Sequence, residues 1–560
     1  GTTPSSFDNA DEKILVKLDW NINDNHRAAF TYNYNDGNNT VRSDGDSDEF
    51  EFSNHLYNRG SKLQSYAGAI YSDWTENFST ELRVSYLDFA NDVRPVGGTD
   101  FGEMQIRTAN GLTVYLGGDD SRQSNVLNYD QLDLSFRANY DLDDHSLFFG
   151  VDRQSLDIFN LFVQHTDTEI RFNNVNDFRN GQAARVYYNN APSQNPDDAA
   201  AVWGYAINSV YGQDEWQVND SLSVIAGLRY DWYTTSDLPT ENPGFVADYG
   251  FSNSQNLDGK GLLQPRLAFT WDANDELQFR GGVGRYSGGN PNVWLSNNYS
   301  ANNIDQVGTQ RRNVDLFAET YFGAEDGVPN TAGYAIPGIV WNDVATGMGS
   351  NFELNYLDPE FEIPSDWKYS IGANWTPDFD TGENLFGGVW AFQGDLLWSK
   401  GKDTAIIKRG DLVQTGSQVV ATTDVDGRSA TITVPTYSSP LMDTFTLTNS
   451  SLGNEAFVAS LGVTRDWDNG FKATLGYAYS DAKDVSPMTS SVAFSNYNNR
   501  AFIDPQEEVL ATSNYNIKHR FSGSLSYTKD FWKDYDTNIF AYFQHSSGRP
   551  FSRVDKSPNN

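Results

Sequence analysis

Apolar and polar residues alternate along many short stretches of this chain, and brief polar turns join the stretches two by two. The stretch LSVIAGLRYDW (222–232) has Leu228 among the apolar positions of one parity and Arg229 among the polar positions of the other, with Ile225 as the exception. The stretches FKATLGYAYS and RFSGSLSYT repeat the pattern. A period of two residues predicts β-strands with one apolar and one polar face.

An aromatic residue stands directly before each short turn. The residues in this place are Trp20, Trp74, Tyr140, Trp216, Trp271, Trp375, Trp467 and Trp532. Asn, Asp and Gly, which tolerate turn conformations, dominate the turns that follow. The pattern predicts about sixteen strands in eight hairpins, over residues 12–35, 61–91, 124–158, 201–235, 261–288, 366–400, 455–482 and 516–548.

The connections between these hairpins differ sharply from the short turns. They are long and acidic, we expect them to be irregular, and they cover 36–60, 92–123, 159–200, 236–260, 289–365, 401–454 and 483–515. A soluble β-sandwich has no reason to keep such an asymmetry over eight hairpins. Outer-membrane barrels have short periplasmic turns, long extracellular loops and aromatic girdles. We therefore predict an all-β, antiparallel transmembrane β-barrel whose turn tryptophans form the periplasmic girdle, rather than core tryptophans of a soluble β protein.

The composition agrees with this fold class. Aromatic residues make up 14% of the 560 residues, and the mean hydropathy of −0.57 matches a barrel with a polar interior. The net charge of −36, from 75 acidic and 39 basic residues, argues against nucleic acid as a partner. The chain contains no cysteine, which excludes disulfides and thiolate metal sites. We interpret residues 1–560 as one barrel domain and as a fragment of a longer protein.

Four segments carry a resemblance to a known family: 213–233, 262–300, 358–375 and 480–527. The first resembles the barrel hairpin of TonB-dependent outer-membrane receptors. The other three resemble the Oar-like branch, whose members usually carry a carboxypeptidase-regulatory-like domain. The resemblance implies a barrel of 22 strands, of which about sixteen are visible in this chain. The plug, the TonB box, the N-terminal domain and the closing strands are not recognisable here.

The resemblance also implies partners and a location. The barrel would lie in the outer membrane of a Gram-negative bacterium, in contact with lipid and lipopolysaccharide. TonB, ExbB and ExbD would energise uptake through family parts that are absent from this chain, and a lipoprotein partner remains open.

One acidic connection begins in the manner of a calcium loop. In DGDSDEFE, Asp44, Asp46 and Asp48 alternate as calcium ligands do at positions 1, 3 and 5. The sixth position is Glu49 instead of Gly, and the twelfth is His55 instead of Glu, so the segment is not an EF-hand. Calcium binding and a solvated acidic loop both remain open, and we expect no other cofactor.

A second connection opens with aromatic and amide side chains suited to binding a sugar or a peptide. The candidate substrate-binding residues are Asn290, Trp294, Asn297, Asn298 and Tyr299. Stacking on the rings and hydrogen bonds to the amides would hold such a ligand. The alternative is a loop that packs against its neighbours or the barrel rim.

The glycine-rich stretch FRGGVGRYSGG (279–289) precedes these residues. Its spacing fits no phosphate-binding motif, and we expect no helix after it. In the predicted register, Arg280, Gly282 and Gly284 face the lumen, where the glycines would let plug or loop backbone approach the wall. Further lumenal residues that could contact a plug are Arg137, Arg229 and Lys472.

No nucleophile or metal constellation points to an enzyme. The six histidines show no HxxxH spacing, and GxSxG, HExxH and P-loop motifs are absent from the sequence. The leading hypothesis is active transport of a large or scarce substrate, a peptide, protein or glycan, captured by the long loops. The alternatives are a passive porin-type channel and a surface adhesion or structural barrel.

Overall fold

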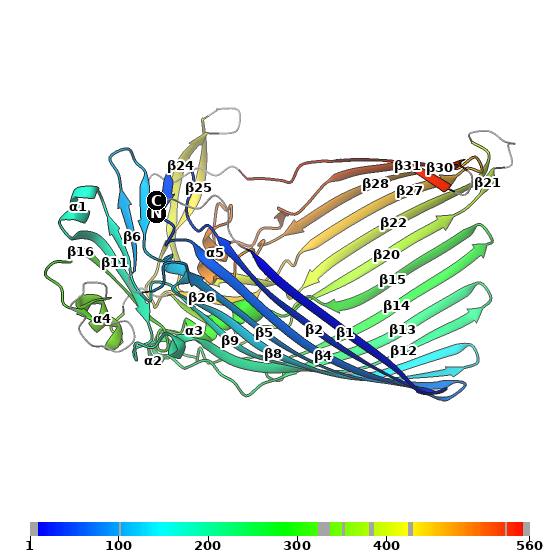
Figure 1. The fold of residues 1–560 in the computed structure, drawn as a ribbon, viewed down its shortest axis with the longest axis horizontal. Coiled ribbons are helices and arrows are strands. Elements are labelled where there is room, and N and C mark those ends of the chain that lie inside the picture. The colour runs from blue at the N-terminus through cyan, green and yellow to red at the C-terminus, as the bar shows by residue number, and fades with distance from the viewer. Residues whose placement is uncertain are drawn as a thin grey trace.

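Sixteen long strands form one antiparallel sheet in the computed structural model, which describes residues 9–99, 102–322, 336–349, 353–379, 386–423, 429–532 and 535–552 (Figure 1). The prediction of about sixteen strands in eight hairpins is confirmed. The long strands are β1 (Ala10–Asn23), β2 (His26–Val41), β4 (Tyr57–Thr75), β5 (Phe78–Pro95), β8 (Ser124–Leu142), β9 (His145–Val163), β12 (Ala201–Asn219), β13 (Leu222–Thr234), β14 (Gly261–Asn274), β15 (Leu277–Ser287), β20 (Ser365–Trp375), β22 (Gly388–Lys402), β27 (Glu455–Asp466), β28 (Phe471–Asp484), β30 (His519–Trp532) and β31 (Tyr535–Ser546). The two-residue strands β21 (Asp378–Phe379) and β29 (Ala511–Thr512) add to the same sheet.

Each long strand pairs with the next long strand along the chain, from β1–β2 to β30–β31. The sheet curves from blue β1 round to red β31, as an open trough (Figure 1). Among the described residues, β1 pairs only with β2, and β31 pairs only with β30. The sheet therefore keeps two open edges within the part of the chain that the structure describes.

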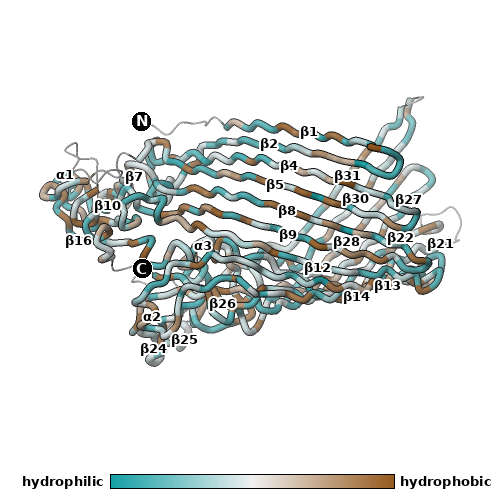
Figure 2. The backbone as a smooth tube through the Cα atoms, turned by 90° about the horizontal axis from the view of Figure 1, so that it is seen from below, coloured by the Kyte–Doolittle hydropathy of each residue, from teal (hydrophilic) through white to brown (hydrophobic). Residues whose placement is uncertain are grey.

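One face of this sheet is apolar and exposed. On β8, Leu132, Leu134 and Phe136 are exposed and alternate with polar residues, and Figure 2 shows brown segments along the strands. A soluble sheet would bury such residues, whereas lipid solvates them in a transmembrane barrel. Among the described residues, helices long and apolar enough to cross a membrane are absent.

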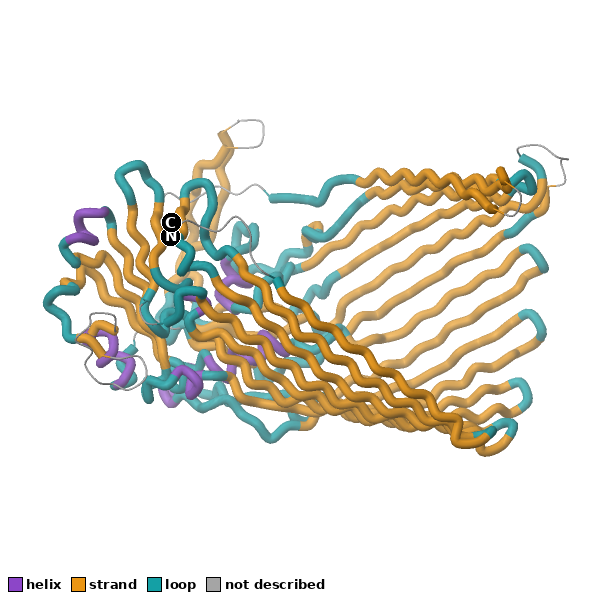
Figure 3. Tube along the Cα trace, in the orientation of Figure 1, coloured by secondary structure: helices purple, strands orange, loops and turns teal. Residues whose placement is uncertain are grey.

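The short turns lie at one end of the sheet, and every purple helix lies at the other (Figure 3). The long connections were expected to be irregular, and this expectation is wrong for several of them. A six-stranded sheet, here called the loop sheet, assembles from four connections: β3 (Glu49–Glu51), β6 (Glu103–Arg107), β7 (Thr113–Leu116), β10 (Glu169–Phe172), β11 (Gln182–Asn190) and β16 (Val307–Asp315). These strands are short, and the pairings β3–β7, β6–β10 and β11–β16 join different connections, so none produces a clear local pattern.

Smaller elements complete this end. They are η1 (Asp120–Arg122), α1 (Val175–Arg179), η2 (Pro196–Ala199), α2 (Pro243–Tyr249), α3 (Asn292–Ser300), β17 (Tyr321–Phe322), β18 (Ile336–Pro337), α4 (Gly338–Ala345), β19 (Leu354–Leu357), β23 (Ala405–Arg409), β24 (Val413–Thr423), β25 (Ser429–Ser438), β26 (Thr444–Asn449) and α5 (Ala493–Asn498). The buried core also lies at this end. One apolar cluster joins β12 to α3, α5 and β26, and a second joins the loop sheet to α4. The long connections are thus folded together around apolar cores of their own.

Candidate functional site

The segment after the glycine-rich strand is a helix, so the expectation that no helix follows is wrong. Gly289 has a φ of 96°, which ends the extended strand, and Pro291 is the N-cap of α3. Proline fixes φ near its helical value and therefore suits a helix start. The glycines between 281 and 284 still lie inside β15, and the segment keeps no phosphate-binding arrangement.

The five candidate substrate-binding residues are engaged by the protein's own loops. The Trp294 indole donates to the Ser490 carbonyl at 2.9 Å, and the Asn297 amide donates to the Ser491 carbonyl at 2.8 Å. Tyr299 is 5% exposed and stacks on Trp203 with 5.1 Å between ring centroids. The Tyr299 ring is therefore packed in the core beside Trp203.

Of the two remaining residues, Asn290 is half-buried and Asn298 is buried. Asn290 accepts a hydrogen bond from the Tyr233 hydroxyl, and the side-chain amide nitrogen of Asn298 has no hydrogen-bond partner. The geometry matches the packing alternative, and a ligand contact by these five residues stays a prediction.

Two predicted lumenal arginines lie on the polar face of the sheet. Arg229 forms ion pairs with Asp152 at 3.0 Å and Asp231 at 2.7 Å, and Arg137 donates to the Tyr211 hydroxyl at 3.2 Å. A hollow of about 290 Å³ is lined by both arginines and by Asn290, among other residues. The structure therefore brings the lumenal residues and one residue of the candidate binding segment to the same hollow.

A second lumenal group surrounds the glycines. Arg280 pairs with Asp395 across the intervening residue Gly372. A Cβ at Gly284 would lie 2.9 Å from the Tyr286 ring, so this ring, rather than loop or plug backbone, fills the space above Gly284 among the described residues.

Two basic side chains and a second glycine lie beside the Tyr286 ring. The cations of Arg266 and Lys368 both lie over the Tyr286 ring, at 4.6 and 5.5 Å from its centroid. A Cβ at Gly282 would meet the Leu267 carbonyl at 3.0 Å. Lys472 lies further along the sheet and pairs with Asp466 at 3.7 Å. Contact of any of these residues with a plug stays a prediction.

The girdle tryptophans lie near the short turns. Trp20, Trp74, Trp216, Trp271, Trp375 and Trp532 are exposed, and Trp467 is half-buried. The Trp216 ring stacks on His145 at 5.5 Å, and Trp74 meets His26 edge-on at 5.1 Å. An exposed ring at this level suits the polar–apolar boundary of a membrane.

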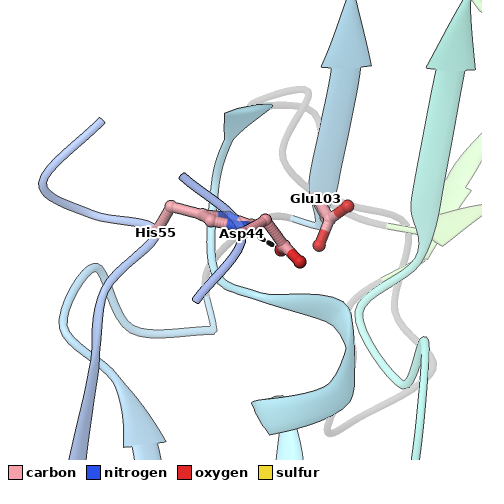
Figure 4. Close-up of side chains that lie close together, drawn as sticks. All are labelled: Asp44, His55 and Glu103. Atoms are coloured by element: carbon pink, nitrogen blue, oxygen red, sulfur yellow. Dashed lines mark hydrogen bonds and ion pairs between the residues drawn. The ribbon is translucent and has the colours of Figure 1, made fainter. Parts of the chain in front are cut away.

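The candidate calcium residues make different contacts within the protein. Asp46 accepts hydrogen bonds from the backbone of Asp48 and Glu49, which closes a turn. Asp44 instead pairs with Nε2 of His55 at 2.8 Å, and Glu103 lies close to both (Figure 4). Asp44 and Asp46 thus have different partners, and calcium binding by the three residues stays a prediction.

His55 is fully buried, and both of its ring nitrogens face oxygen acceptors. Nδ1 lies 3.1 Å from the Gly117 carbonyl, which can only accept, and Nε2 faces the carboxylate of Asp44. Burial lowers the pKa of His55, but the hydrogen bond to Asp44 and the nearby carboxylates outweigh it and raise the pKa to about 9.

The cluster continues beyond His55 into a chain of carboxylates and a second histidine. Its members, called the histidine–carboxylate cluster, are Asp44, His55, Glu103, Asp119, Asp120, His165 and Glu169. Burial, followed by the charge of Asp120, raises the pKa of Asp119 to about 7 and that of Glu103 well above its usual range. Burial also acts on Asp120, but the contact with His165 outweighs it and lowers the Asp120 pKa. These side chains offer nitrogen and oxygen ligands that can hold a metal ion.

Sequence reasoning missed this cluster, except for Asp44. Its members come from three different connections, and parallel pairing of β6 with β10 places Glu103 directly opposite Glu169. Neither histidine has a second histidine at ligand spacing. The only local signal was the acidic DGDSDEFE segment.

Comparison with known proteins places these features in a family. The family described as "Outer membrane beta barrel domain" matches residues 2–541. No curated protein matches the chain. Among solved structures, the chain is similar to the outer membrane transporter YddB from Escherichia coli, at 13% identity and a TM-score of 0.53, over 93% of this chain and 55% of that chain.

Two receptors show a comparable likeness. The ferric enterobactin receptor PfeA from Pseudomonas aeruginosa matches at 10% identity and a TM-score of 0.52, over 100% of this chain and 61% of that chain. The siderophore receptor PirA from Acinetobacter baumannii matches at 12% identity and a TM-score of 0.50, over 95% and 58%. The chain spans less than two thirds of the length of these three proteins. At such identities the likeness concerns the fold.

Proposed function

Because the chain belongs to the outer membrane beta barrel domain family and lies in the cell outer membrane, we propose that it is the barrel of a TonB-dependent active transporter of the Oar-like branch. The resemblance of segments 213–233 and 262–300 supports the branch. The likeness in fold to the outer membrane transporter YddB and to the receptors PfeA and PirA supports the wider class.

The open edges of the main sheet are the observation that carries the proposal. Lipid cannot satisfy unpaired backbone groups, so a spanning sheet must close on itself. Within the described residues, β1 and β31 each have one partner. We propose that about six further strands of the full-length protein lie between them, which gives the 22 strands typical of plugged transporters.

The proposed mechanism uses both ends of the barrel. The long connections, folded into the loop sheet and its neighbours, capture a peptide, protein or glycan. The lumenal side chains of Arg137, Arg229 and Arg280 face a plug that TonB, ExbB and ExbD rearrange. Lipid and lipopolysaccharide surround the apolar face, and a lipoprotein remains a proposed partner. The role of the chain is transport without catalysis.

A passive porin is the second candidate, because barrels of 16–18 strands leave a water channel and sixteen long strands are present here. Uptake by cells that express the full-length protein separates the two. Mass spectrometry of ligand that co-purifies with the protein first identifies the substrate. Uptake that stops when TonB is deleted supports active transport, and uptake that persists at the same rate contradicts it.

A further inference from the structure

Three ligand atoms of the histidine–carboxylate cluster, from Asp120, His165 and Glu169, lie within 4.8 Å of one another. Nδ1 of His165 lies 3.0 Å from Oδ2 of Asp120 and 3.4 Å from Oε2 of Glu169. This nitrogen is completely buried and has no hydrogen-bond partner. Two oxygens and a buried nitrogen at these separations resemble the edges of a tetrahedral metal site, which are about 3.3 Å for ligand bonds near 2.0 Å.

The charges beside His165 give a second, independent reason for a cation. Glu103 and Glu169 stand directly opposite each other on β6 and β10, and each is 1% exposed. Two buried carboxylates in directly opposite positions repel each other when both are charged, and a cation beside them removes this repulsion. Arg171 forms an ion pair with Oε1 of Glu169. Among the described residues, Glu103 has no Lys or Arg within ion-pair distance, and it accepts hydrogen bonds from Gln105 and from the Asp120 backbone.

We propose that Asp120, His165 and Glu169 bind one divalent metal ion of the Zn²⁺ type. The ligands are Nδ1 of the imidazole and one oxygen of each carboxylate. Imidazole nitrogen suits Zn²⁺ and related ions, whereas Ca²⁺ takes six to eight oxygen ligands. Glu103 supports the site through its Oε2, which accepts a hydrogen bond from the Asp120 backbone at 2.8 Å.

The bound ion would fasten two extracellular connections to each other. Asp120 begins η1, in the connection that leads into β8, and His165 and Glu169 lie in the connection that follows β9. His165 has a φ of 62°, and the turn it forms aims its ring at Asp120. The site therefore lies where the loop sheet adjoins the ends of β8 and β9, outside the membrane-spanning strands. Metal binding at this site does not depend on the proposed transport function.

Zinc binding to the full-length protein tests the site. The protein is purified in detergent, stripped with a chelator and titrated with Zn²⁺ by calorimetry, with elemental analysis after dialysis. We expect one Zn²⁺ per chain. His165→Gln and Glu169→Gln should each weaken binding about a hundredfold or more, because even the partners that merely support a ligand contribute about 10- to 100-fold.

His145→Gln is the control, since it removes a histidine at the opposite end of β9 from His165 and should leave zinc affinity within about threefold. His55→Gln tests the neighbouring group of Asp44, His55 and Glu103. Heat-dependent migration in gels reports whether each variant is folded. If a ligand variant does not fold, zinc absorption spectroscopy of the wild-type protein decides, and one imidazole among the ligands is expected. Folded wild-type protein that binds no Zn²⁺, prefers Ca²⁺, or loses zinc through His55→Gln but not His165→Gln overturns the proposal.

Discussion

Replacing Leu267 by arginine tests whether the apolar face of the main sheet contacts lipid. Leu267 lies in the middle of β14, its side chain is 51% exposed, and it precedes Trp271 by four residues on the same face. At about 3.3 Å per residue and a strand tilt of about 40°, this separation places Leu267 about 10 Å above the girdle. Half of an apolar band about 25 Å tall is about 12 Å, so Leu267 lies close to the bilayer midplane.

An arginine at the midplane of a barrel's lipid-facing surface costs about 2–4 kcal/mol. Leu267→Arg should therefore lower the free energy of unfolding by this amount, a roughly 30- to 900-fold change in the folding equilibrium. The assay is urea unfolding of the full-length protein in phosphatidylcholine vesicles, followed by tryptophan fluorescence.

Ala268→Arg is the matched control, because the next residue along β14 points to the polar face. There it pairs with Gly282, and both residues line a hollow of about 840 Å³ that can take a long side chain. We expect the control to change the free energy of unfolding by less than about 1 kcal/mol. If the control is destabilised as much as Leu267→Arg, the assignment of lipid-facing and lumenal faces is refuted.

Three further outcomes follow from the described contacts. Gly284→Leu should displace the Tyr286 ring and lower the free energy of unfolding in urea by about 1–3 kcal/mol. Gly462 has open space above it, so Gly462→Leu should leave this free energy nearly unchanged. Equal effects of the two variants would contradict the packing of Tyr286 over Gly284. Arg229→Met should cost about 2 kcal/mol in the same assay, because it strands two carboxylates, and an unchanged midpoint would contradict this. The pKa of His55 is raised to about 9, so its ion pair with Asp44 stabilises the folded connection fully below about pH 6.5 and is lost as pH rises through 9. Protease cleavage of residues 42–56 in zinc-free buffer should therefore increase over this pH range. Asp44→Asn should remove this pH dependence, and a dependence that persists would contradict the assignment.

The membrane-spanning strands could be predicted because their signals are local. Each hairpin combines a period of two residues with an aromatic residue before a polar turn, and all of these lie within about 35 residues of sequence. The lipid-facing and lumenal parities follow from the same period, so Arg229 and Arg280 could be assigned to the polar face before their carboxylate partners were known.

The extracellular end could not be predicted in the same way. The strands of the loop sheet are short, and parallel pairing of β6 with β10 brings together Glu103 and Glu169 from different connections. Pairing over such distances leaves no periodic trace in either segment. The helix α3 was missed because its apolar residues pack on several sides, so no amphipathic pattern marks it.

Cross-linking β1 to β31 in the full-length protein tests the central claim most directly. The chain has no cysteine, so pairs can be introduced cleanly, with Val16→Cys and Tyr32→Cys as the positive control on paired strands. Val16→Cys is then combined with one cysteine at each position of 537–543 on β31, and a short bis-maleimide is added. The proposed transporter predicts cross-linking in the control pair and in none of the β1–β31 pairs, because further strands separate them. Efficient cross-linking of β1 to β31 would show a sixteen-stranded barrel and contradict the account.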